Sequence, residues 1–111
     1  MADEFKPGEI LAVLQRHGVE FVIIGGLAAA LHGSPFVTTD IDVTPRRAHK
    51  NLGRLSAALK KLEARIRTEA IAEGLPFDHD ARSLANMSLL NLTTRFGDLD
   101  ISIEPIGTTG Y

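Results

Sequence analysis

The sequence of 111 residues contains no cysteine and no tryptophan. The absence of cysteine excludes disulfides, thiol catalysis and a cysteine-ligated zinc site. Aromatic side chains are scarce, with five Phe and one Tyr, so a platform of stacked aromatic rings for single-stranded RNA is not expected.

Long apolar segments are also missing. The longest apolar stretch, Phe21 to Leu31, is far shorter than a bilayer span and is interrupted by Gly25-Gly26. The first residues lack the basic and apolar regions of a signal peptide. We therefore expect a cytoplasmic protein with no membrane partner.

The remaining composition is that of one globular domain over residues 1–111. Apolar residues make up 44% of the chain and charged residues 23%, which is ordinary for such a domain. The formal net charge is only −2, but eight of the twelve basic residues and one of the fourteen acids fall between 46 and 67. That segment is therefore at +7 and the rest at −9. Such asymmetry indicates an anionic partner, for which RNA is one candidate.

Hydrophobic periodicity predicts a small mixed β-sheet with flanking helices, an α+β or α/β-like fold. Apolar residues at helical spacing predict helices over 7–17 and 47–62, and Phe21-Val22-Ile23-Ile24 is typical of a strand buried on both faces. The other predicted elements are a short helix over 27–31, a strand over 39–43, an edge strand near 65–67, a turn at 74–76, a helical turn at 81–86, and a hairpin of strands 87–94 and 99–103.

Asp40-Ile41-Asp42 carries the most chemical information. Alternate side chains of a strand share a face, so Asp40 and Asp42 project together while Ile41 points the other way. Two adjacent carboxylates repel each other unless a cation lies between them. Hard oxygen ligands at this spacing suit Mg²⁺, which is usually bound through one or two carboxylates plus substrate phosphates.

Gly25-Gly26 supplies a second half of the predicted site. The pair follows an apolar strand and precedes a short helix, and without side chains it lets backbone N–H groups approach a phosphate. The glycines and the two carboxylates together predict a site for a magnesium nucleotide.

A third carboxylate is expected on the last strand. Leu99 and Ile101 alternate with Asp98 and Asp100, so one face is apolar and the other acidic. A strand next to Asp40 and Asp42 could complete a site with three acids, which can hold two metal ions roughly 3.5–4 Å apart. Both Asp98 and Asp100 are candidates; Asp100 is preferred because it follows an apolar residue.

These residues resemble the signature of the polymerase-beta-type nucleotidyltransferase superfamily. That signature is an apolar residue with Gly-Gly, then Asp-apolar-Asp-apolar, then an acid on a later strand. Within the superfamily, Leu31 to Pro35 and Thr39 to Asp42 are similar to a bacterial branch that includes the toxins of abortive-infection toxin–antitoxin pairs.

The resemblance implies an enzyme that transfers a nucleoside monophosphate from a nucleoside triphosphate to an acceptor hydroxyl of RNA, protein or a small molecule. It implies that Asp40, Asp42 and Asp100 are catalytic and bind Mg²⁺, and that Gly25 and Gly26 contact the phosphates. It also implies a cognate antitoxin or toxin as partner. Members of this branch continue into a C-terminal helical segment that follows the equivalent of residue 111.

Asp40 to Thr44 also fits the nucleophile motif of haloacid-dehalogenase-type phosphatases, but that motif belongs at the first strand of a longer core. The alternative that stays open is a non-catalytic protein that keeps the fold in order to bind a nucleotide or a partner.

Overall fold

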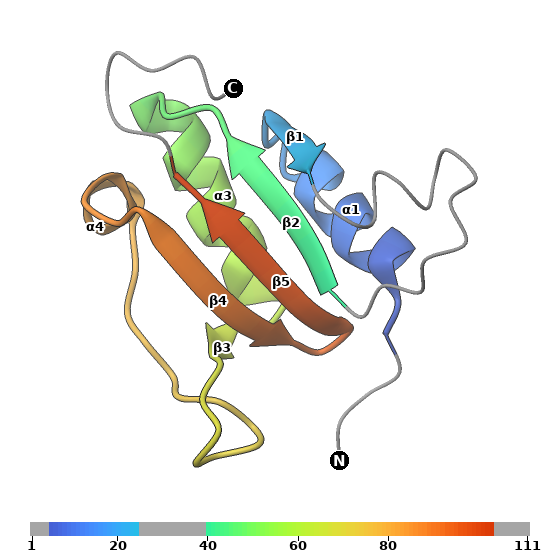
Figure 1. The fold of residues 1–111 in the computed structure, drawn as a ribbon. Helices are drawn as coiled ribbons and strands as arrows, with labels where there is room; N and C mark the ends of the chain where they lie inside the picture. The colour runs from blue at the N-terminus through green and yellow to red at the C-terminus, as the bar shows by residue number, and fades with distance from the viewer. Residues whose placement is uncertain (1–4, 25–39, 104–111) are drawn as a thin grey trace.

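The computed structural model describes residues 5–24 and 40–103, with the side chain of Asp40 excepted. The elements are α1 (Pro7–Arg16), β1 (Phe21–Ile24), β2 (Asp40–Pro45), α3 (His49–Lys61), β3 (Arg65–Ile66), α4 (Ala81–Ala85), β4 (Leu89–Thr94) and β5 (Gly97–Ser102). They confirm the predicted α+β class (Figure 1). The predicted helix over 27–31 and the glycine turn lie outside the described residues.

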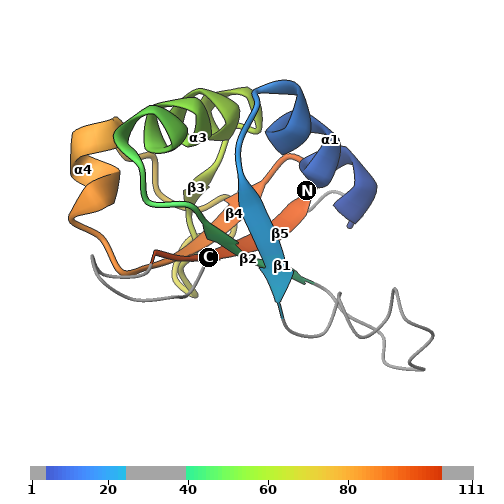
Figure 2. The ribbon, with the colours of Figure 1, turned by 90° about the horizontal axis from the view of Figure 1, so that it is seen from above.

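The five strands form one mixed sheet in the order β1-β2-β5-β4-β3. β2 and β5 run parallel, whereas the other three neighbouring pairs are antiparallel. Figure 2 shows that α1, α3 and α4 all lie on the same side of this sheet. The core is therefore the layer between these helices and one sheet face.

Alternation along the strands explains which face is covered. Ile41 on β2 and Leu99 and Ile101 on β5 are fully buried against the helices. The apolar stripe of α3 meets them, with Leu52, Leu55 and Leu59 fully buried. Each strand thus contributes its intervening residues to the opposite face.

The prediction that β1 is buried on both faces is wrong. β1 is an edge strand of the described sheet, and only its Phe21 and Ile23 side pack on the core. Val22 and Ile24 remain 38% and 40% exposed. A continuous apolar run is therefore compatible with a strand that has helices on one face only.

The β4–β5 hairpin is confirmed and has the two-residue loop Arg95-Phe96. Gly97 follows the loop with φ +116°, and a Cβ there would lie 2.6 Å from a ring carbon of Phe5. Glycine is therefore required at this position both by the backbone and by the N-terminal segment that packs on it. The turn predicted at 74–76 lies earlier, since Leu75 forms a bridge with Ile66.

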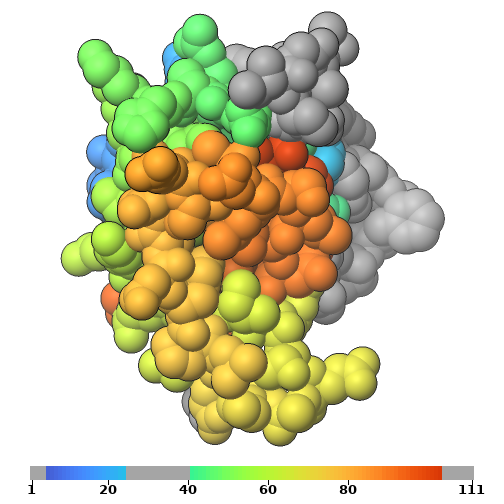
Figure 3. All heavy atoms as spheres, turned by 90° about the vertical axis from the view of Figure 1, so that its left-hand side faces the viewer, coloured from blue at the N-terminus to red at the C-terminus, as the bar shows by residue number. Residues whose placement is uncertain are grey.

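The segment between β3 and α4 runs along the outside of the molecule. Figure 3 shows that it forms one continuous surface with α4. The hydroxyl of Ser56 on α3 contacts Nδ1 of His79 at 2.7 Å and donates to the carbonyl of His79 at 3.1 Å, which fastens this segment to α3. Among the described residues, no helix has the length and hydropathy needed to cross a membrane.

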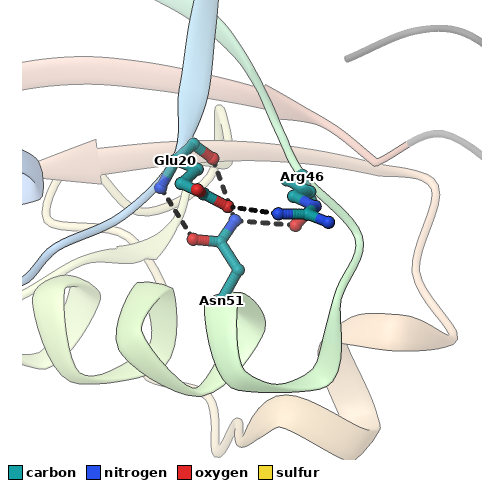
Figure 4. A network of polar contacts seen from close by, with 3 residues as sticks. All are labelled: Glu20, Arg46 and Asn51. Carbon is teal, nitrogen blue, oxygen red and sulfur yellow. Dashed lines mark hydrogen bonds and ion pairs between the residues drawn. The ribbon is translucent and has the colours of Figure 1, made fainter.

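Asn51 ties the sheet to α3 through a buried polar network (Figure 4). Its side chain, on a residue only 2% exposed, accepts from the N–H of Glu20 at 2.7 Å. It also donates to the carbonyls of Glu20 at 2.9 Å and Arg46 at 2.7 Å. The residue before β1 and the residue after β2 are thereby held against the first turn of α3.

We predict that Asn51→Ala lowers the free energy of unfolding by about 3 kcal/mol, because three hydrogen bonds to backbone groups are lost at a buried position. Urea denaturation measures the change. Asn86→Ala is the control, since Asn86 is exposed and makes one side-chain hydrogen bond, to Arg82 at 3.2 Å. Its expected cost is below about 1 kcal/mol. Equal losses in the two variants would contradict the role of the network.

Candidate functional site

The candidate site lies on the sheet face that none of the described helices covers. Its central residues are Asp42 on β2 and Asp100 on β5, which are register partners of the parallel pair. Neighbouring strands are about 4.8 Å apart and partners share a face. The two carboxylates are therefore neighbours on one surface.

A second row of the same face contains the other two acids. Asp40 is the register partner of Asp98. This pair lies two residues along the strands from the pair of Asp42 and Asp100. The strand pairing therefore gives each aspartate of the Asp-x-Asp motif a counterpart on β5. Both Asp98 and Asp100 lie on the face of the motif, and the register alone does not choose between them.

Burial and charge distinguish the two acids of β5. The side chain of Asp100 is 14% exposed and that of Asp98 is 37% exposed. Both are paired with Arg67, which follows β3: Nη1 lies 3.1 Å from Oδ2 of Asp98, and Nη2 donates to Oδ1 of Asp100. The more buried acid, Asp100, remains the preferred third carboxylate.

The carboxylates around Arg67 change the pKa of its guanidinium. Burial lowers the pKa of its guanidinium, but the hydrogen bond and charge of Asp100, together with those of Asp98, outweigh burial and hold the pKa above its ordinary value. The guanidinium therefore stays charged and supplies one positive charge to the acidic face.

The donor set fits Mg²⁺ in its chemistry. Asp42 and Asp100 are carboxylates on adjacent strands, and within the described part of the chain Asp42 has no ion-pair partner. The cation that lies at the carboxylates of β5 in this structure is the guanidinium of Arg67. Among the residues whose side chains are described, no group of three His, Cys, Asp or Glu is arranged to hold a metal. The side chain of Asp40 does not belong to that set.

The predicted phosphate contact involves Gly25 and Gly26, which follow β1. β1 ends at Ile24, the register partner of Asp42, and Gly25 and Gly26 follow it in the sequence but lie outside the described residues. The predicted contact between these glycines and a phosphate therefore stays a prediction.

The basic segment from 46 to 67 is divided among separate roles. Arg46 pairs with Glu20 at 3.1 Å, and Arg47 donates to the carbonyl of Ala85. Lys50 and Arg54 are exposed on α3, whose buried residues face the sheet. The exposed basic side of α3 thus points away from the sheet, on the side opposite to the carboxylates.

Arg67 is the site residue that sequence reasoning missed. Its signal was present, because Arg65 and Arg67 are two residues apart, which is the spacing of Asp98 and Asp100. The two arginines can be related to the two aspartates only when the strand order β3-β4-β5 is known. That order brings together segments more than thirty residues apart in the sequence.

We predict opposite effects on stability for two isosteric changes in metal-free buffer. Asp42→Asn should leave the free energy of unfolding level or raise it, because it relieves repulsion with Asp100. Asp100→Asn should lower it by about 1 kcal/mol, because Arg67 loses a charged hydrogen-bond partner at a mostly buried position. Urea denaturation with a chelator present compares them, and a loss of equal size in both variants would argue against this charge distribution.

Comparison of this chain with protein-family models, with curated proteins and with solved structures gives no match.

Proposed function

We propose that the chain is a magnesium-dependent nucleotidyltransferase of the polymerase-beta type, acting in the cytoplasm. The observation that supports this most is the parallel pairing of β2 with β5, which makes Asp42 and Asp100 neighbours on a face without described helices. An Asp-x-Asp strand beside a strand with a further acid is the arrangement that the resemblance implies.

In the proposed reaction the oxygen of an acceptor hydroxyl forms a bond to the α-phosphorus of a nucleoside triphosphate. The bond from that phosphorus to the bridging oxygen breaks, and pyrophosphate leaves with the bonding electrons. Asp40 and Asp42 would hold Mg²⁺, and Asp100 would complete the site and take the hydroxyl proton. Bound Mg²⁺ would supply neutralisation of the phosphate charge. Catalysis of this kind depends mainly on positioning and charge.

The acceptor stays open among RNA, a protein hydroxyl and a small molecule. The resemblance to toxin–antitoxin nucleotidyltransferases makes a cognate antitoxin or toxin the proposed protein partner. The place of α3 argues against an RNA acceptor guided by the basic helix, because Lys50 and Arg54 point away from the acidic face.

We predict that the native chain binds nucleoside triphosphates in calorimetry with Mg²⁺ and loses that binding with a chelator. Asp42→Asn should weaken the affinity at least about tenfold, because a metal-holding carboxylate becomes a neutral amide. Asp78→Asn is the control: Asp78 is exposed, precedes α4 and carries the same charge. Unchanged affinity in Asp42→Asn would reject the metal site.

Transfer itself is tested by mass spectrometry of total tRNA and of the protein after incubation with Mg²⁺ and each triphosphate. If tRNA gains a nucleotide, we predict that the double change Lys50→Gln and Arg54→Gln leaves its yield unchanged within about twofold, because both side chains point away from the acidic face. A large loss of yield would mean that the acceptor crosses α3.

A non-catalytic role is favoured by one observation, the pairing of Arg67 with both acids of β5. In such a protein the guanidinium would be a permanent counter-ion. Nucleotide binding without metal dependence, together with no transfer to any acceptor, would select this alternative.

A further inference from the structure

Arg67 is held so that its side chain crosses the sheet. Its backbone N–H donates to the carbonyl of Asn91 on β4 at 2.9 Å, which fixes it beside that strand. Asn91 is in turn the register partner of Asp100 on β5. The guanidinium therefore reaches over β4, one strand further, to contact Asp98 and Asp100.

The pairing is specific to one of two similar arginines. Arg65, on β3, lies two residues before Arg67 and is the register partner of Thr93. It is exposed and makes no ion pair with any described carboxylate. Charge alone therefore does not explain the contacts of Arg67. They are explained by its position beside Asn91, which is the register partner of Asp100.

A guanidinium at this position and a divalent cation compete for the same oxygens. Oδ1 of Asp100 accepts from Nη2 of Arg67, and a metal bound to that carboxylate would face the guanidinium charge at close range. In a partly buried setting such repulsion is poorly screened, since the Arg67 side chain is only 32% exposed. A metal bound at Oδ1 of Asp100 would therefore require Arg67 to leave that oxygen.

We propose that Arg67 is a displaceable counter-ion of Asp98 and Asp100 that lowers the affinity of the site for a divalent cation. This inference rests on the proposed function, because it concerns the same carboxylates. In the free protein Arg67 relieves the repulsion among the acids. When a metal ion binds, the guanidinium leaves Asp100. Breaking this ion pair costs free energy, and the affinity for the metal is lowered as a result.

The test is calorimetric titration of the full chain with Mn²⁺ alone, a cation with a similar preference for carboxylate oxygens. We expect Arg67→Gln to bind Mn²⁺ about tenfold more tightly than the native chain, because the competing charge is gone. Arg65→Gln removes the same charge two residues away and should change the affinity by less than about twofold, which separates direct competition from the general field of the protein.

Arg67→Lys provides a second variant that keeps the charge but loses the planar fork that contacts two carboxylates. Its affinity for Mn²⁺ should lie between those of the native chain and Arg67→Gln, and it carries the test if Arg67→Gln does not fold. Thermal melting gives an independent readout, in which the rise in Tm on adding Mn²⁺ should be largest for Arg67→Gln.

The outcomes separate the two proposals. If the native chain binds Mn²⁺ and the Arg67 variants bind it equally or more weakly, Arg67 orients the acids instead of competing, and only the present inference is overturned. If neither the native chain nor any variant binds Mn²⁺, the metal site fails and both proposals fall. Binding by Arg67→Gln alone would support competition in its strongest form.

Discussion

The parallel pairing of β2 with β5 is the constraint on which the rest of the structure depends. Ile41 and Leu99, and likewise Val43 and Ile101, are register partners that must face the helices to be buried. Because side chains alternate, the intervening aspartates have to occupy the other face. A slip of one residue would place carboxylates in the core, so the hydrophobic effect that builds the core also sets the acidic surface.

Bringing these acids together costs electrostatic free energy, and Arg67, which follows β3, offsets part of it. Neighbouring carboxylates repel, and water screens them poorly where a side chain such as that of Asp100 is only 14% exposed. Arg67 contacts both acids of β5, whereas Asp42 has no ion pair within the described residues. The compensation is therefore uneven among the described side chains, because Asp98 and Asp100 are paired with Arg67 whereas Asp42 has no ion pair.

One expectation read from local composition was wrong, and a second stays a prediction. The apolar run of β1 suggested burial on both faces, yet Val22 and Ile24 lie on the uncovered side of an edge strand. The basic segment indicated an anionic partner, which stays untested, but its side chains do not act as one group: Arg46 pairs with Glu20 and Arg67 with Asp98. Residues that are close in the sequence can have similar side chains and still lie in different environments, because alternate residues of a strand face opposite sides of the sheet.

The sequence by itself determined the α+β class, most helix and strand positions, and the alternation that groups Asp42 with Asp40 and Asp100 with Asp98, because these follow from local periodicity. It also predicted the hairpin of strands 87–94 and 99–103, although β5 begins earlier, at Gly97. Only the tertiary structure decided that Asp42 lies beside Asp100, that Asn51 joins β1 and β2 to α3, and that Arg67 reaches the acids. These contacts join residues far apart in the chain, and their pairing depends on strand order, which no local pattern encodes.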